Sequence, residues 1–252
     1  MFAPEDLSDD TFLGGKLLLW QPLKGYRAAT DPVLMAAAVP AKPGQSVLDL
    51  GCGAGTASLC LAARVPGLTL TGLELQPDYA DLARRNADRA AIPFEVIEGD
   101  LTQMPTELLR GFDHVIANPP YYAATGSPSP DVGRDIALRG TTPMVAWVDA
   151  AARRLHPGGL LTMIVTADRL PEVLGALHKR LGSAVVLPLA PRINRAATRV
   201  IVQARKGGRS AFRLLAPLIM HEGEAHDGDR KNYSAALTAI LADASDLSAQ
   251  LR

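Results

Sequence analysis

Short apolar runs alternate with amphipathic stretches along the chain from residue 45 onward. The runs have the length and composition of strands that are buried on both faces of a sheet. We predict strands at residues 46–50, 69–73, 94–97, 112–117, 160–165, 184–189 and 199–204, and helices at 56–64, 77–91 and 145–155. Strands that alternate with helices are typical of βαβ units. The pattern therefore predicts an α/β fold with a doubly wound, mostly parallel, seven-stranded sheet.

Two regions lie outside this alternation. Residues 12–30 predict a hairpin, and a helix follows in which Asp31 is the expected N-cap and Pro32 the first helical residue. Residues 122–143 are rich in Gly, Pro, Ala and Thr and predict a long loop. The chain is accordingly divided into an N-terminal hairpin and helix extension (1–44), an α/β domain (45–210) and a C-terminal extension in the same globule (211–252).

The composition is that of a globular protein. Of the 252 residues, 48% are hydrophobic, and 26 basic residues balance 26 acidic ones, which excludes a largely disordered chain. No stretch is long and apolar enough to span a membrane, and the acidic N-terminus differs from a secretory signal. Two cysteines and five dispersed histidines exclude a disulfide framework and a multi-ligand zinc site. We expect a cytoplasmic protein with no membrane partner and no metal.

The balanced net charge hides an asymmetry between the two halves of the chain. Residues 1–125 contain 9 basic and 15 acidic residues, whereas residues 126–252 contain 17 basic and 11 acidic ones. No acidic residue lies between Glu172 and Glu222, although nine Lys or Arg residues do. A stretch of this kind favours a polyanionic partner such as RNA. A solvated face of an ordinary domain explains the charges equally well.

A glycine-rich turn follows the first predicted strand of the sheet. It runs from Asp49 through Gly51 and Gly53 to Gly55. Glycines let a ligand approach the backbone closely, and the next helix offers free N–H groups at its start. The GxGxG spacing differs from the GxGxxG of dinucleotide-binding turns. The alternative is a tight turn that binds nothing.

Two acidic residues follow the second and third predicted strands. Glu74 can accept hydrogen bonds from both ribose hydroxyls of an adenosine-containing cofactor, and Asp100 can accept one from an adenine amino group. Either residue alone could be a surface charge. Together with the glycine turn, they predict a site at the carboxyl ends of three consecutive strands.

The sequence Asn118-Pro119-Pro120-Tyr121 follows the fourth predicted strand. A planar amino group has its lone pair delocalised, so its methylation is favoured by acceptors that hold its N–H groups as it rehybridises. The side-chain oxygen of Asn118 and the carbonyl of Pro119 can be those acceptors, and the prolines restrict the backbone. Tyr121 can stack on a base. The same tetrapeptide could also simply begin a loop.

These segments together resemble a known family. DLGCGAG, LELQPDYADLARRNADRA, EGD and FDHVIANPPYY resemble class I S-adenosylmethionine-dependent methyltransferases that modify adenine N6 or glutamine N5. The preceding segment, QPLKGYRAATDPVLMA (21–36), resembles the lead-in of the tRNA1(Val) adenine-N6 methyltransferases. The resemblance implies a Rossmann-like fold, S-adenosylmethionine as cofactor, tRNA as substrate, and an N-terminal extension that packs on the cofactor site. Residues 214–252 match no motif of that family.

The resemblance also implies roles for individual residues. The implied catalytic residues are Asn118, Pro119 and Tyr121. The implied cofactor-binding residues are Asp49, Gly51, Cys52, Gly53, Gly55, Glu74, Leu75, Asp100, Leu101 and Asn118. The expected substrate-binding residues, which include three arginines of the basic stretch, are Pro120, Tyr121, Tyr122, Arg192, Arg195 and Arg199.

Three functions are compatible with these motifs. The first is methyl transfer to N6 of an adenine in RNA, most readily tRNA. The second is methylation of a glutamine amide in a protein such as a release factor, because that nitrogen is also planar. Enzymes of the second kind usually have a helical N-terminal domain, whereas here a predicted hairpin precedes the glycine turn. The third is a non-catalytic module that binds S-adenosylmethionine or RNA, which would not require the Asn-Pro-Pro-Tyr sequence.

Overall fold

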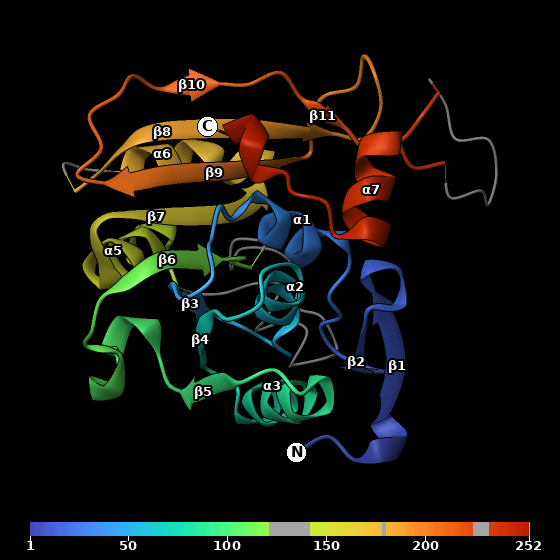
Figure 1. Cartoon of the computed structure of the whole chain (residues 1–252). Coiled ribbons are helices and arrows are strands. Elements are labelled where there is room, and N and C mark those ends of the chain that lie inside the picture. Colours follow the sequence, from blue (N-terminus) through green and yellow to red (C-terminus); the bar gives the residue numbers. More distant parts are fainter. Residues whose placement is uncertain (121–141, 178–179, 224–231, 252) are drawn as a thin grey trace.

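A twisted sheet with helices on both faces forms the centre of the molecule (Figure 1). The computed structural model describes residues 1–120, 142–177, 180–223 and 232–251. The predicted strands are present as β3 (Ser46–Leu50), β4 (Thr69–Glu74), β5 (Phe94–Glu98), β6 (Phe112–Ala117), β7 (Leu155–Thr166), β8 (Leu181–Ala190) and β9 (Arg199–Lys206). Their order in the sheet is β8-β9-β7-β6-β3-β4-β5. Strands β3 to β7 are parallel, and β9 runs antiparallel to both β7 and β8.

The predicted α/β fold and its seven strands are confirmed, and two further short strands extend the sheet. In the described part of the chain the sheet has nine strands, because β10 (Arg213–Leu214) and β11 (Leu218–Ile219) pair with the outer edge of β8. Each has only two residues, too few for a recognisable periodic pattern. Strand β7 also begins five residues earlier than predicted, because the segment from Leu155 joins the edge of β6 before a register shift.

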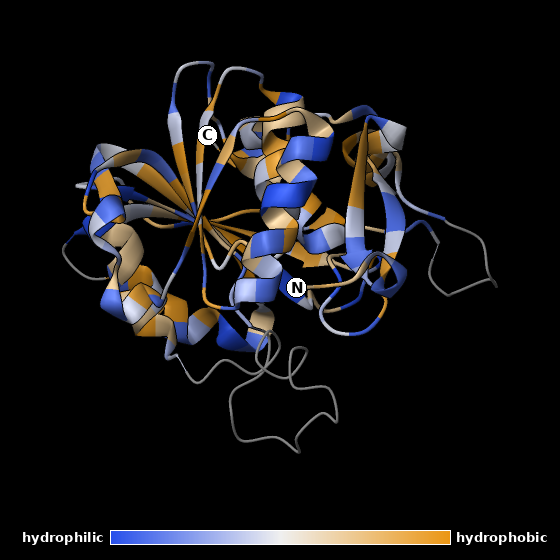
Figure 2. Ribbon diagram, turned by 90° about the horizontal axis from the view of Figure 1, so that it is seen from below, coloured by the Kyte–Doolittle hydropathy of each residue, from blue (hydrophilic) through white to orange (hydrophobic). Residues whose placement is uncertain are grey.

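The helices divide between the two faces of the sheet. The predicted helices are present as α1 (Thr30–Ala38), α2 (Thr56–Arg64), α3 (Pro77–Ala90) and α5 (Met144–Arg154), and the structure adds α6 (Leu170–Ala176) and α7 (Ala235–Asp243). Ile116 packs in the core beneath α1 and α2, whereas its neighbour Val115 packs in the core beneath α5 and α6. Because both faces are covered, the central strands are largely hydrophobic, and much of their length is orange in Figure 2.

Helix α1 starts one residue before the predicted N-cap. Ala29 occupies the cap position, and Asp31 lies inside the first turn without capping it. The Asp31 carboxylate instead accepts a hydrogen bond from Arg199 Nε at 2.9 Å. The prediction that Asp31 caps this helix is therefore wrong, because its side chain pairs with a guanidinium from β9.

The predicted hairpin is present as β1 (Leu7–Phe12) and β2 (Leu17–Pro22). The fully buried side chain of Asn86, on α3, ties it to the glycine turn. Asn86 Oδ1 accepts from Trp20 N at 2.8 Å, and Nδ2 donates to the carbonyls of Trp20 and Ala54, both at 3.0 Å. The hairpin is thereby held against the carboxyl ends of the strands.

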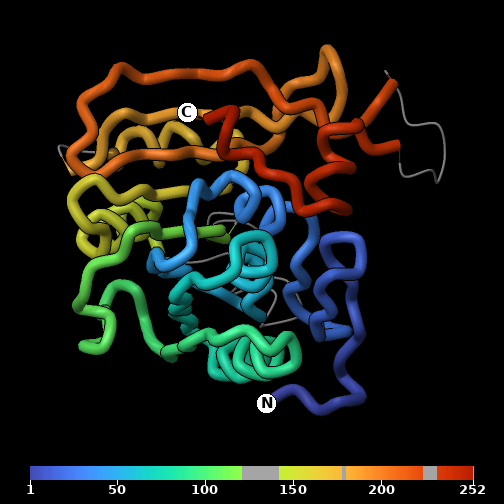
Figure 3. The backbone as a smooth tube through the Cα atoms, viewed as in Figure 1, coloured from blue at the N-terminus to red at the C-terminus, as the bar shows by residue number. Residues whose placement is uncertain are grey.

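The C-terminal segment packs beside the hairpin, as the blue and red parts of Figure 3 show. Lys16 Nζ donates to the Asp243 carbonyl at 3.0 Å, and Leu237, Ile240 and Leu247 are buried in the same core as α1. Residues 232–251 therefore share the core of the α/β domain. None of the helices in the described ranges is long and apolar enough to cross a membrane.

Candidate functional site

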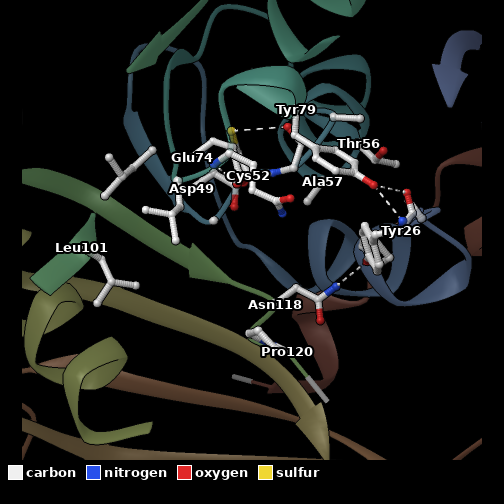
Figure 4. Close-up of a pocket in the computed structure, with 18 of the residues that line it drawn as sticks. Tyr26, Asp49, Cys52, Thr56, Ala57, Glu74, Tyr79, Leu101, Asn118 and Pro120 are labelled. Atoms are coloured by element: carbon white, nitrogen blue, oxygen red, sulfur yellow. Dashed lines mark hydrogen bonds between the residues drawn. The ribbon is translucent and has the colours of Figure 1, made fainter. Parts of the chain in front are cut away.

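A pocket opens at the carboxyl ends of β3, β4, β5 and β6, and Figure 4 shows its lining side chains. Parallel strands end at the same edge of a sheet, so the residues that follow them converge there. The structure brings together these sequence-predicted residues along the pocket: Asp49, Gly51, Cys52, Gly53, Glu74, Leu75, Asp100, Leu101, Asn118 and Pro120. Separate motifs of the sequence therefore form one site.

The glycine turn serves both the pocket and the packing behind it. Gly51 has φ +66°, and a Cβ atom there would lie 2.8 Å from Trp147 Cη2, so the indole closes directly on the backbone. Gly55 does not line the pocket; its Cβ would lie 3.1 Å from Phe94 Cε1. Its closeness to Phe94 shows that this glycine allows α2 to start against β5, and its role in cofactor binding stays a prediction.

Glu74 lies at the end of β4 with its carboxylate buried against the glycine turn. Its Oε2 accepts from Gly53 N at 2.8 Å and its Oε1 accepts from Gln76 N at 2.9 Å. Burial raises the pKa of this carboxyl, while the backbone N–H groups partly offset that effect. The carboxylate is thus preorganised beside the open backbone of Gly53.

Asp49 is a second buried acid in the same wall. Ser58 Oγ donates to its Oδ2 at 2.8 Å, and only 2% of the residue is exposed. The pKa of Asp49 is raised to about 7: burial is the main cause, the hydrogen bond from Ser58 opposes it, and the nearby Glu74 adds to it. The described partners of both acids are neutral N–H and O–H groups. Two buried carboxyl groups with neutral partners suit a cationic ligand.

Cys52 and Asp100 complete the predicted cofactor side. Burial raises the pKa of the Cys52 thiol well above its usual range, and Asp49 and Glu74 add to the effect. Cys52 is therefore a small apolar filler and not a thiolate nucleophile. Asp100 Oδ1 accepts from the backbone and hydroxyl of Thr102, both at 2.8 Å, which caps the short helix Leu101–Gln103.

Asn118 follows β6 and carries an unpaired acceptor. Its Nδ2 donates to the Tyr26 hydroxyl at 3.3 Å, while its buried Oδ1 has no hydrogen-bond partner among the described residues. Pro120 lines the pocket, whereas the buried Pro119 does not. Tyr121 and Tyr122 lie outside the described residues, so their predicted roles stay predictions. A buried unpaired oxygen is costly, and an N–H donor on a ligand would satisfy it.

Several pocket residues were not predicted from the sequence. Gln21 comes from β2 of the hairpin, and Tyr26 from the segment that follows it. The others are Met35 from α1, Tyr79 from α3 and Trp147 from α5. Gln21, Tyr26 and Met35 belong to the segment 21–36 that resembles the family's lead-in, and Tyr79 belongs to the resembling segment 73–90; this resemblance was the available signal. Their spacing does not reveal that the hairpin folds back over the glycine turn.

The predicted arginines of the substrate surface behave differently from one another. Arg192 is 9% exposed and donates to the carbonyls of Glu222 and Gly223, and Arg199 pairs with Asp31. The guanidinium groups of Arg192 and Arg199 thus already have partners within the protein, and their role on the substrate surface stays a prediction. Arg195 is exposed in the loop between β8 and β9. None of the three lines the pocket.

The chain is similar to proteins that carry out methyl transfer. The family described as "Methyltransferase small domain" matches residues 29–187. A Dickeya chrysanthemi protein named tRNA1(Val) (adenine(37)-N6)-methyltransferase is 29% identical over 227 residues, covering 86% of this chain and 87% of that protein. A Porphyromonas gingivalis protein of the same name is 35% identical over 159 residues, 58% of this chain and 61% of that protein. The crystal structure of a predicted O-methyltransferase from Agrobacterium tumefaciens has a TM-score of 0.68 and 29% identity, covering 83% and 94% of the two chains.

Proposed function

Because the chain belongs to the methyltransferase small domain family, we propose that it transfers a methyl group from S-adenosylmethionine to N6 of an adenine in tRNA. The observation that carries this proposal is the buried Oδ1 of Asn118, which has no hydrogen-bond partner among the described residues and lies in the wall of a pocket that also contains the glycine turn and Glu74. An amino N–H group of the substrate would supply the missing donor. The names of the relatives specify adenine 37 of tRNA1(Val), and we propose the same target here.

The residues of the pocket fit the cofactor chemically. When bound, S-adenosylmethionine supplies a methyl group that is activated by a positively charged sulfonium. Asp49 and Glu74 contribute buried carboxyl groups with neutral partners, which suits a positively charged donor. Among the described residues, a Cβ atom built on Gly53 would meet only Tyr26 Cε1, at 4.0 Å, so a ligand can approach that side of the turn closely. We propose that Glu74 holds the ribose hydroxyls and that Asp100 and Leu101 lie at the adenine.

Asn118 would act on the acceptor nitrogen. Its Oδ1, and the carbonyl of Pro119, would accept the two N–H groups of the amino group and favour the rehybridised nitrogen. The prolines on either side of that carbonyl restrict its direction. Once methylated, the nitrogen becomes acidic and loses its proton readily, so a strong general base is not required. This agrees with the described lining of the pocket, which contains no histidine.

The proposed substrate also implies the place of action and the contacts to RNA. A tRNA substrate would place the enzyme in the cytoplasm. Exposed basic residues outside the pocket, among them Arg195, would contact phosphates without reading bases. An anticodon-loop base is already partly unstacked, which lowers the cost of turning it into the pocket.

The proposal is tested by incubating the purified protein with an unmodified tRNA1(Val) transcript and labelled S-adenosylmethionine. We expect N6-methyladenosine in the digested RNA, detected by nucleoside mass spectrometry. A transcript with guanine in place of adenine 37 is the matched control and should accept no methyl group. A parallel reaction with release factor tests the protein substrate. Methylglutamine in the factor, together with unmodified RNA, would overturn the proposal.

A further inference from the structure

The backbone of Tyr26, a residue that lines the pocket, is held on both sides by one hydroxyl group. The Tyr79 hydroxyl accepts from Tyr26 N at 2.7 Å and donates to the Tyr26 carbonyl at 3.1 Å. Tyr79 lies on α3 and is 3% exposed, so this clamp is anchored by a buried helix residue. The preceding Gly25 has φ +110°, and a Cβ atom there would lie 2.7 Å from the Tyr79 hydroxyl. The chain therefore needs glycine at this position for the clamp to close.

The clamped residue touches both parts of the pocket. Its ring lies close to the glycine turn, since a Cβ built on Gly53 would be 4.0 Å from Tyr26 Cε1. Its hydroxyl accepts the hydrogen bond from Asn118 Nδ2 at 3.3 Å, and Figure 4 shows the amide oxygen of Asn118 directed away from Tyr26. The Tyr26 side chain thus contacts Asn118 and also lies near the glycine turn.

The contact matters because the two ends of an asparagine amide have opposite chemistry. If the amide turned by half a rotation about its last torsion, an NH₂ group would face the incoming amino group and two donors would meet. The torsion of an asparagine amide is soft, so a free side chain would populate several orientations. The hydrogen bond to Tyr26 restrains that torsion and leaves Oδ1 as the unpaired end.

We propose that Tyr26 is a positioning residue for Asn118. Its hydroxyl holds the amide so that the acceptor oxygen faces the substrate amino group, and its ring, which lies near Gly53, fixes the position of that oxygen relative to the glycine turn. The proposal rests on the proposed methyl transfer to an amino group. It extends the site to a segment before the first strand of the main sheet. Tyr26 acts through Asn118 and needs no contact with the reacting atoms.

The test compares two Tyr→Phe variants that remove the same atom. In Tyr26→Phe we expect kcat for methylation of unmodified tRNA to fall about tenfold, the effect of one lost hydrogen bond. The KM for RNA and the Kd for S-adenosylhomocysteine by calorimetry should stay within about twofold. Tyr233→Phe is the matched control, because Tyr233 packs on His221 and does not line the pocket. It should retain the kcat of the parent enzyme.

A double-mutant cycle separates positioning from a general structural effect. If Tyr26 acts through Asn118, then Tyr26→Phe should cause no further loss of kcat in an Asn118→Ala background. The Asn118 side-chain amide, assigned by its absence from the NMR spectrum of Asn118→Ala, should shift in Tyr26→Phe and not in Tyr233→Phe. Additive losses, or an unchanged kcat in Tyr26→Phe, would overturn the inference. A parent enzyme that forms no N6-methyladenosine contradicts the proposed function, and the amide spectrum then still decides whether the contact exists.

Discussion

The sequence indicates two functional regions, the glycine-turn pocket and the basic stretch of residues 173–221. In the structure, the first forms an open site, whereas the second has most of its charged groups bonded within the protein. In the pocket, residues from four strand ends converge, and Asn118 Oδ1 has no partner within the part of the chain that the structure describes. In the basic stretch, most charged side chains are engaged within the protein. Arg192, Arg205, Lys206 and Arg213 all donate to backbone carbonyls.

The difference has a physical origin. Residues after parallel strands share one edge of the sheet because of the hydrogen-bonding pattern, whatever their side chains are. A run of arginines carries no such constraint, so each long side chain pairs with the nearest carbonyl or carboxylate that packing brings close. Motifs tied to strand ends therefore predict a site more reliably than charge runs do.

The strongest test of the pocket is Asn118→Ala. Removing the acceptor should lower the single-turnover rate of methyl transfer by about a hundredfold or more, by analogy with the loss of one oxyanion-hole donor. The affinity for S-adenosylmethionine should change much less, because the group acts at the acceptor nitrogen. Rapid-quench kinetics and calorimetry measure the two quantities. Full activity of this variant would remove Asn118 from the chemistry.

Glu74→Ala should instead act on cofactor binding. The variant loses a buried carboxylate that is preorganised by two backbone N–H groups, and we expect a loss of about 2 kcal/mol in binding free energy. Calorimetry with S-adenosylmethionine measures it. Glu95→Ala, a change of the same kind at a side chain that does not line the pocket, is the control. Equal affinities for the two variants would place the ribose elsewhere.

The raised pKa of Asp49 predicts a dependence on pH. Because this pKa is about 7 in the folded protein and 3.8 as a reference, the folded state keeps a proton that the unfolded chain loses between these values. The stability of the free protein should therefore fall as the pH rises through that window and level off above it. Denaturant titrations at several pH values measure this trend, and Asp49→Asn should flatten it.

The same proton should be displaced by the cofactor. The deprotonated acid attracts a cationic ligand, so affinity for S-adenosylmethionine should rise about tenfold from about pH 6 to about pH 8, with proton release on binding. The raised pKa of Glu74 acts in the same direction. Calorimetry in buffers of different ionisation enthalpy counts the protons. An identical pH slope in Asp49→Asn would show that another group titrates.

The smallest expected effects concern the arginines. Arg195→Ala should weaken tRNA binding a few-fold and reduce the salt slope of the affinity by about one ion. Arg192→Ala should leave that slope unchanged and lower the melting temperature, because it removes the hydrogen bonds from the guanidinium to the carbonyls of Glu222 and Gly223. Filter binding at several salt concentrations and thermal melts measure both. A reduced slope in Arg192→Ala would return that residue to the RNA surface.

The sequence alone determined the parts of this protein that follow from local periodicity. The seven main strands, helices α2 and α3 and the glycine turn lie within a few residues of their predicted bounds. The convergence of Glu74, Asp100 and Asn118 in one pocket was also predictable, because parallel strands that end at one edge bring their following residues together.

Only the tertiary structure decided which distant segments meet. Tyr26 reaches Asn118 across 92 residues of chain, and Arg199 reaches Asp31 across 168. Asn86 ties the hairpin to the glycine turn through three hydrogen bonds that no spacing in the sequence reveals. Such contacts depend on how whole elements pack, and packing is set by the shapes of buried surfaces and not by the period of any one segment.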